Sequence, residues 1–242
     1  MLNLDKSKQV VLDLTKSLGI GNQKAQVVLA IDYSGSMNHL YHNGTVQRIV
    51  ERIIPIAMAF DDNEAIEVYR FDHGSKKIGT DVTPHNYEGY VDKYVNTGSM
   101  GGTNYTPVME AITKDFTKSK GGSFIKKLFG SKTMSDAQAA ELPVYVIFIT
   151  DGDCSDANET LRYVKEISNR EIFWQFVGVG YSSFRTLEQL DTVGGRVVDN
   201  ANFFQISDSK KLLSMTDEQL YGKLLHEFPD WLRQAKQLDI IK

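Results

Sequence analysis

The stretch Val27-Val-Leu-Ala-Ile-Asp-Tyr-Ser-Gly-Ser36 decides the fold. Its first five residues form an unbroken apolar run, which is typical of a strand covered on both faces, as in a parallel sheet between helices. Its second half carries three oxygen-bearing side chains at alternate positions, Asp32, Ser34 and Ser36. Gly35 between the two serines permits a tight turn. The stretch therefore predicts a buried strand that runs directly into a polar loop.

Similar apolar runs recur along the chain and alternate with segments of helical periodicity. The predicted strands cover residues 27–31, 66–71, 144–149 and 172–179, with a weaker candidate at 203–206. The predicted helices cover residues 46–60, 86–95, 107–117, 157–170, 184–190 and 217–237. Pro55 is expected to kink or restart its helix, and Pro229 to kink the last one. Strands alternating with helices predict an α/β fold with a doubly wound, mostly parallel central sheet flanked by helices.

Composition narrows the class of protein. The chain has 242 residues, 41% of them hydrophobic, which favours one large globular domain over two small ones. Its Lys+Arg count of 27 against an Asp+Glu count of 31 gives a net charge of −4, which argues against a nucleic-acid partner. The single cysteine, Cys154, cannot form an internal disulfide, and no apolar run has the length of a transmembrane segment. We therefore expect a cytoplasmic protein.

Polar loops follow the first and third predicted strands, and a glycine-rich loop lies between them. The third strand ends in Thr-Asp151-Gly-Asp153, and the loop at 98–107 offers the hydroxyl of Thr103. Because the carboxyl ends of parallel strands meet at one edge of a sheet, we expect these loops to converge. Two carboxylates packed together repel each other unless a proton or a cation lies between them. Carboxylates and hydroxyls are the hard ligands that suit Mg²⁺.

These motifs resemble the von Willebrand factor A (vWA) domain, which has a Rossmann-like fold. The shared features are Asp-x-Ser-x-Ser after the first strand, a threonine in a later loop and Asp-Gly after a central strand. The metal-ion-dependent adhesion site (MIDAS) of that family maps onto Asp32, Ser34, Ser36, Thr103 and Asp151. The resemblance implies a bound divalent cation, foremost Mg²⁺ with Mn²⁺ and Ca²⁺ as alternatives. It also implies a partner protein that presents an Asp or Glu carboxylate to this cation.

A narrower resemblance comes from the surrounding sequence. The stretches at 43–55, 60–62, 87–91 and 101–107 are similar to the vWA proteins of bacterial tellurium resistance (TerF-like), relatives of the copine A domain. Residues 1–24 are similar to the opening of Ter-type domains and would be a remnant of one. The predicted organisation is therefore an N-terminal segment at 1–24 and a vWA domain at 25–242, with a surface insert at about 118–142. The resemblance implies a role in a tellurite- or stress-resistance system.

Two other functions remain open beside metal-dependent protein binding. Asp32 after a strand resembles an aspartyl nucleophile, so a Mg²⁺-dependent phosphoryl-transfer or hydrolytic enzyme is one alternative. The second acid that such enzymes carry two residues later is Ser34 here, and no phosphate-binding Gly-x-x-x-x-Gly-Lys-[Ser/Thr] motif occurs. We therefore predict a protein that is not an enzyme. A scaffold with a vestigial metal site is the other alternative.

Several residues near the predicted site need a separate interpretation. Candidates for an outer shell or rim of the site are Asp153, Gly102, His39 and His42. His39 and His42, together with His73, could suggest zinc, but without supporting thiolates they are interpreted as surface residues. Asp156 is interpreted as the N-cap of the helix after it, and Cys154 as a small residue beside the site. The short basic patch at 124–129 is interpreted as part of the surface insert.

Overall fold

The computed structural model describes residues 3–117 and 142–242. Most of the predicted surface insert, including the patch at 124–129, lies outside the described residues.

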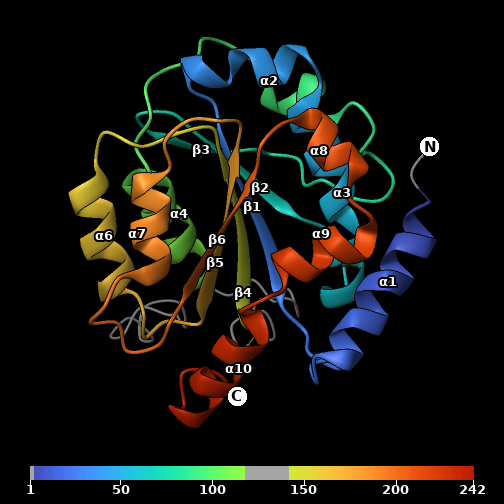
Figure 1. Ribbon diagram of the computed structural model, residues 1–242, viewed down its shortest axis with the longest axis vertical. Helices are drawn as coiled ribbons and strands as arrows, with labels where there is room; N and C mark the ends of the chain where they lie inside the picture. Colours follow the sequence, from blue (N-terminus) through green and yellow to red (C-terminus); the bar gives the residue numbers. More distant parts are fainter. Residues whose placement is uncertain (1–2, 118–141) are drawn as a thin grey trace, which may run out of the picture.

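A six-stranded sheet forms the centre of the molecule, with strand order β3-β2-β1-β4-β5-β6 (Figure 1). The strands are β1 (Gln26–Asp32), β2 (Glu67–Phe71), β3 (Ser75–Lys77), β4 (Val144–Thr150), β5 (Ile172–Val179) and β6 (Ala201–Ile206). Every neighbouring pair is parallel except β2 and β3. The predicted doubly wound, mostly parallel α/β fold is therefore confirmed. The edge strand β3 was missed because all three of its residues are exposed and carry no apolar pattern.

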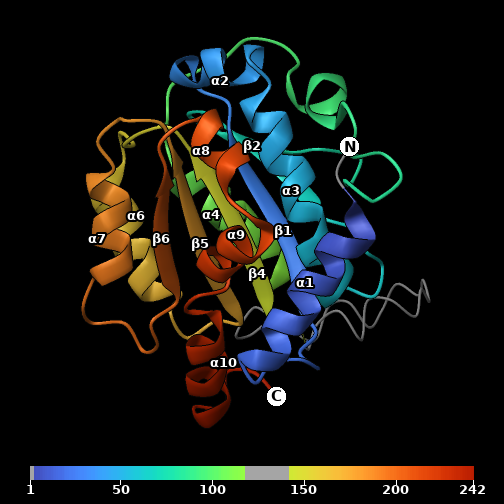
Figure 2. The same cartoon turned by 45° about the vertical axis from the view of Figure 1, so that its right-hand side comes forward.

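Helices cover both faces of this sheet (Figures 1 and 2). One face carries α4 (Thr106–Phe116), α6 (Ala157–Glu166) and α7 (Arg185–Thr192). The other carries α1 (Leu4–Ser17), α3 (Thr45–Phe60), α9 (Asp217–Leu224) and α10 (Phe228–Gln237). Shorter pieces are a 3₁₀ turn, η1 (Gly35–Met37), the helices α2 (Asn38–His42) and α8 (Ser209–Ser214), and a π-helical turn, η2 (Val91–Val95).

Three helix predictions need correction. The helix predicted at 86–95 is only the π-helical turn at Val91–Val95, preceded by Gly89 with a φ of 65°. The helix predicted at 217–237 is two helices, and Pro229 lies in the first turn of α10, where its missing N–H has no partner to lose. The predicted restart of the helix at Pro55 is wrong, because α3 runs through it as a single helix with its apolar stripe buried against the sheet; the kink at Pro55 stays a prediction.

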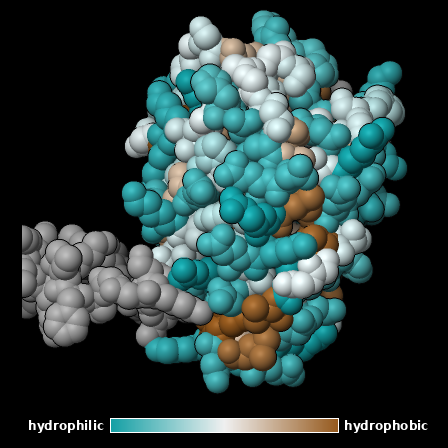
Figure 3. All heavy atoms as spheres, turned by 90° about the vertical axis from the view of Figure 1, so that its left-hand side faces the viewer, coloured by the Kyte–Doolittle hydropathy of each residue, from teal (hydrophilic) through white to brown (hydrophobic). Residues whose placement is uncertain are grey.

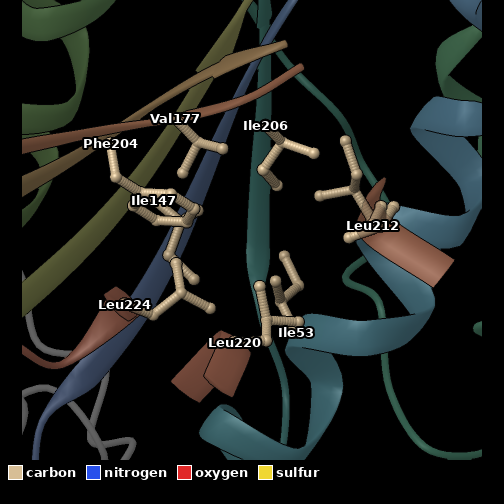
Figure 4. Close-up of a pocket in the computed structure, with 9 residues that line it drawn as sticks. Ile53, Ile147, Val177, Phe204, Ile206, Leu212, Leu220 and Leu224 are labelled. Atoms are coloured by element: carbon tan, nitrogen blue, oxygen red, sulfur yellow. The ribbon is translucent and has the colours of Figure 1, made fainter. Parts of the chain in front are cut away.

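The core consists of two apolar layers, one on each face of the sheet. Every residue of β4 and β5 is buried, as expected for central strands covered on both sides. Trp174 and Trp231 are both core residues, one in each layer. A small cavity between the sheet and α3, α8 and α9 is lined only by apolar side chains, among them Ile53, Ile147 and Leu220 (Figure 4).

The N-terminal helix α1 lies against α3 and α9 (Figure 2). Val11 is fully buried in this contact. The hydroxyl of Ser7 donates to the Asp217 carboxylate, which also accepts a 2.9 Å hydrogen bond from Arg52 of α3. The N-terminal helix therefore packs against elements from the middle and the last part of the described chain. The division of the chain at residue 24 stays a prediction.

The side of the molecule that carries α6 and α7 is mostly hydrophilic, and its apolar atoms gather in a few small patches (Figure 3). No helix in the described part of the chain is both long and apolar enough to cross a lipid bilayer.

Candidate functional site

The candidate site lies where the strand order of the sheet reverses. From β1, the chain places β2 and β3 on one side and β4, β5 and β6 on the other. Asp32 is the last residue of β1, and Asp151 directly follows β4, the strand paired with β1. In open α/β sheets this switch point is the usual location of ligand sites, because the loops diverge there and leave a crevice.

Asp32 is fully buried, and both of its carboxylate oxygens accept hydrogen bonds. The backbone N–H of Ser34 donates to Oδ1 at 2.8 Å, and the hydroxyl of Thr150 donates to Oδ2 at 2.6 Å. The Tyr41 hydroxyl donates to the backbone carbonyl of Asp32 at 2.8 Å and so fixes the end of the strand. Burial raises the pKa of Asp32 to about 6 although these donors oppose it, and the negative charge of Asp151 raises the pKa further.

A chain of hydroxyl contacts leads from Ser34 to Asp151. The Oγ atoms of Ser34 and Ser36 lie 3.0 Å apart, and Ser36 Oγ donates to Asp151 Oδ1 at 2.7 Å. Ser34 and Asp151 are buried, whereas Ser36 is exposed, so the cluster opens to solvent at Ser36. Burial raises the pKa of Asp151, while the Ser36 hydroxyl and the nearby His39 work in the opposite direction.

The glycine-rich loop that carries Thr103 is joined to the candidate site by backbone hydrogen bonds. Gly35 N–H donates to the carbonyl of Gly101 at 3.0 Å, and Ser155 N–H donates to the carbonyl of Thr103 at 2.9 Å. These bonds join the glycine-rich loop to the loops after β1 and β4. A Cβ on Gly101 would lie 2.9 Å from the Cβ of Asp72, so this close approach requires glycine. The side chain of Thr103 is half-buried, and the neighbouring Gly102 is exposed.

The two other acids of the loop after β4, Asp153 and Asp156, accept hydrogen bonds from backbone N–H groups at the starts of helices. Asp153 Oδ1 accepts from the backbone N–H of Thr186 at 2.9 Å, in the first turn of α7. Asp156 accepts from Tyr105 N–H at 2.9 Å and from Thr106 N–H at 2.8 Å, at the start of α4. The prediction that Asp156 is the N-cap residue of α6 is confirmed. Its carboxylate makes no hydrogen bond to α6, however, and instead accepts from two unpaired N–H groups of α4.

Residues that the sequence analysis did not single out hold this site in place. The Tyr105 hydroxyl donates to Thr150 Oγ1 at 3.2 Å, behind Asp32. Arg70 of β2 lies over the ring of Tyr33 at 4.4 Å and donates to the carbonyl of Val95 at 2.9 Å. The Tyr33 hydroxyl donates to the carbonyl of Gly98 at 2.9 Å, so this pair holds the start of the glycine-rich loop. Of these residues, Thr150 could have been identified from the sequence, because it is a polar residue at the end of an apolar strand.

The histidines lie at the surface, as predicted. His39 and His42 belong to α2. The Nδ1 atom of His39 contacts the backbone carbonyl of Ser36, and that of His42 contacts the backbone carbonyl of Asn38. His73 is exposed beside Asp72. Within residues 3–117 and 142–242, no group of three or more His, Cys, Asp and Glu side chains is placed to hold a metal ion. Cys154 is half-buried, and burial beside Asp156 raises the pKa of its thiol to about 12, so the thiol is protonated at neutral pH.

The donor set at the switch point fits a hard divalent cation. Its side chains offer only carboxylate and hydroxyl oxygens, which Mg²⁺ prefers. The oxygens of Ser34, Ser36 and Asp151 lie beside one another, linked by hydrogen bonds of 3.0 Å and 2.7 Å.

Residues 24–241 match a family described as "vWA found in TerF C terminus". The chain belongs to this TerF-like vWA family. The uncharacterized protein YcbR of Bacillus subtilis (strain 168) is 32% identical to this vWA protein over 246 residues, which covers 100% of this chain and 91% of YcbR. The predicted family is thereby confirmed. vWA domains are in general interaction modules.

Solved structures share the fold of this vWA protein at low sequence identity. A von Willebrand factor type A protein from Catenulispora acidiphila matches with a TM-score of 0.54 and 13% identity, over 89% of this chain and 43% of that one. Proximal thread matrix protein 1 from the mussel byssus, solved with a zinc-occupied MIDAS motif, matches with a TM-score of 0.51 and 15% identity, over 88% and 46%. The vWA chain thus spans less than half the length of either.

Proposed function

We propose that this vWA protein is a metal-dependent protein-binding module. A divalent cation, foremost Mg²⁺, is held by five side chains: Asp32, Ser34, Ser36, Thr103 and Asp151. When bound, the cation supplies a Lewis-acidic position that accepts an Asp or Glu carboxylate of a partner protein. The observation that carries the proposal is the contact chain from Ser34 through Ser36 to Asp151, which joins the loops after two neighbouring strands.

The burial of the two acids supports this assignment. Asp32 is fully buried and Asp151 nearly so, and no basic side chain hydrogen-bonds to either carboxylate in the described part of the chain. Two adjacent carboxylates without a counterion are costly, because burial and mutual repulsion both oppose their charged forms. A divalent cation would balance both charges. The exposure of Ser36 and Gly102 leaves one side of the cluster open to a partner.

Metal binding is tested by calorimetric titration of Mg²⁺, and then Mn²⁺, into chelator-stripped protein. We expect saturable binding of one ion, lost in Asp151→Asn. Asp153→Asn is the matched control, because this acid lies two residues away but accepts a hydrogen bond from Thr186 of α7. Equal binding by wild type and Asp151→Asn would contradict the assignment, and no binding by wild type would favour the scaffold with a vestigial site.

Carboxylate binding is tested with acetate as the simplest probe. In Mg²⁺-loaded, ¹⁵N-labelled protein, acetate should shift the amide resonances of the loops at 34–36, 101–103 and 151–152. The same titration in the presence of EDTA should leave these resonances unchanged. Shifts that persist in EDTA would show binding that does not need the metal and would contradict the proposal.

The sequence around Asp32 argues against an aspartyl nucleophile. Ser34 stands where such enzymes carry a second acid, two residues after the nucleophile. A phosphoesterase assay on a generic aryl phosphate with Mg²⁺ should therefore show no turnover above that of Asp32→Ala.

We further propose that the module serves a tellurite- or stress-resistance system, on the strength of its TerF-like family. The test is growth on tellurite of a strain that lacks the gene, complemented by wild type or by Asp151→Asn. We expect complementation by wild type alone.

A further inference from the structure

The loop after β5 lies beside the proposed metal site. Thr150 of β4 pairs with Gly178 of β5, so Asp151 and the residues after Val179 leave the sheet at neighbouring positions. A Cβ on Gly152 would be 3.8 Å from the Cβ of Ser182, which is ordinary contact between the two loops. Tyr181, next to Ser182, therefore belongs to a loop that contacts the loop after Asp151.

Tyr181 is unusually exposed for a large side chain. It is 79% exposed, more than any other large hydrophobic side chain in the described residues. Aromatic side chains are enriched among the residues that contribute most to protein–protein binding, because they bury a large area at a small cost in conformational entropy.

The ring of Tyr181 is held in position although it faces solvent. Its hydroxyl donates to Asp208 Oδ2 at 2.7 Å, and Asp208 Oδ1 accepts from the backbone N–H of Lys211 at 2.7 Å. The backbone before it is fixed to β6, because Gly180 N–H donates to the carbonyl of Ile206 at 2.9 Å. A side chain ordered before binding loses little entropy when a partner covers it.

We propose that Tyr181 is a second contact point for the partner, beside the metal site; this rests on the proposed function. The partner segment carries an Asp or Glu for the cation and, close to it in sequence, an apolar or aromatic side chain that packs on the Tyr181 ring. The preference for an apolar neighbour follows from the hydrogen bonding. Asp208 already accepts the hydroxyl proton, so the ring is the part of Tyr181 that remains to be covered.

The experiment uses phage-displayed heptapeptides with a fixed central Asp and all other positions random, selected on the full chain with Mg²⁺ and counter-selected in EDTA. The peptide with the highest affinity is then made with a fluorescent label, and its Kd is measured by polarisation for each variant. Tyr181→Ala removes the ring, and Tyr181→Phe keeps the ring but not the bond to Asp208. Leu238→Ala is the matched control, because Leu238 is also an exposed apolar residue (53%) but follows α10 at the opposite end of the molecule (Figure 1).

We expect the selected peptides to share an apolar residue at a fixed distance from the Asp. Tyr181→Ala should raise the Kd by about tenfold or more, while Tyr181→Phe and Leu238→Ala stay within about threefold of wild type. The Mg²⁺ affinity of Tyr181→Ala should equal that of wild type. An unchanged peptide Kd in Tyr181→Ala would overturn the inference and leave the proposed function intact. So would a loss of Mg²⁺ affinity in this variant, since the residue would then act on the metal site. Peptides that bind equally in EDTA would overturn the proposed function itself, and the inference with it.

Discussion

The hydroxyl of Thr150 donates a 2.6 Å hydrogen bond to Oδ2 of Asp32, from the strand next to the one that Asp32 ends. Both residues are fully buried. The bond therefore connects β1 and β4 at the point where the strand order reverses, and it orients the Asp32 carboxylate.

Replacing Thr150 by valine keeps the shape of the side chain but removes the donor to Asp32. Hydrogen bonds to charged groups contribute about 1.5–3 kcal/mol, so the free energy of unfolding should fall by about that amount at pH 8. Urea denaturation measures the change. The loss should shrink when Thr150→Val is combined with Asp32→Asn, because the carboxylate charge is then absent. A loss of the same size in both backgrounds would mean that packing rather than the hydrogen bond is responsible.

Gly101 and Gly102 should respond differently to alanine. A Cβ on Gly101 would lie 2.7 Å from His73 Nδ1 and 2.9 Å from Asp72 Cβ, whereas a Cβ on Gly102 would have no atom within 4 Å. Gly101→Ala should cost about 1–3 kcal/mol of unfolding free energy and weaken Mg²⁺ binding, because the loop that carries Thr103 must move. Gly102→Ala should change stability by less than about 0.5 kcal/mol. Thermal unfolding and calorimetry measure both effects, and similar behaviour of the two variants would contradict the geometry.

Asp156→Ala should destabilise the protein through α4, which lies some fifty positions earlier in the chain. The lost bonds to Tyr105 and Thr106 are worth about 1–2 kcal/mol by analogy with helix caps. Although burial opposes it, donation from these two N–H groups lowers the pKa of Asp156 below its usual value. Its stabilising contribution is therefore present above that usual value and is lost as the pH falls further. In Asp156→Ala, hydrogen exchange should become faster in α4 than in α6. A larger increase in α6 would mean that the carboxylate stabilises α6 rather than α4.

Glu227 should make the protein less stable as the pH rises through the weakly acidic range. Burial, followed by the charges of Asp191 and Asp199, raises the pKa of Glu227 from 4.5 to about 7. The folded state therefore binds more protons than the unfolded state between these two values, so the free energy of unfolding declines from about pH 4.5 to pH 7.

The variant Glu227→Gln isolates this effect, because it keeps the shape of the side chain and cannot ionise. Its stability should exceed that of wild type above pH 7, and the difference between the two should vanish near pH 4.5. Chemical denaturation across this range measures the difference. A difference that does not change with pH would contradict the role of Glu227 ionisation.

The sequence analysis predicted the sheet well, because strands buried on both faces carry apolar runs that need no tertiary information to be recognised. It also placed Asp32 and Asp151 at one edge, since the end of each run is visible in the sequence. The capping of α4 by Asp156 could not be predicted, because the two N–H groups that bond to this carboxylate are 50 and 51 positions away in the sequence. The helices α1, α2 and α8 were not predicted; α2 has only five residues and α8 only six, so they offer little periodicity to detect.

The contact of α1 with α9 sets an order of events during protein synthesis. Ser7 and Asp217 are 210 positions apart, so α1 leaves the ribosome long before α9 exists. Helix α3 is translated before α9 and offers part of the surface that α1 covers, but Ser7 gains its hydrogen bond to Asp217 only after residue 217 has been translated. Until then the side of α1 that packs on α9 and the Arg52 guanidinium that bonds to Asp217 lack these partners, so the N-terminal helix reaches its final packing only when α9 is present.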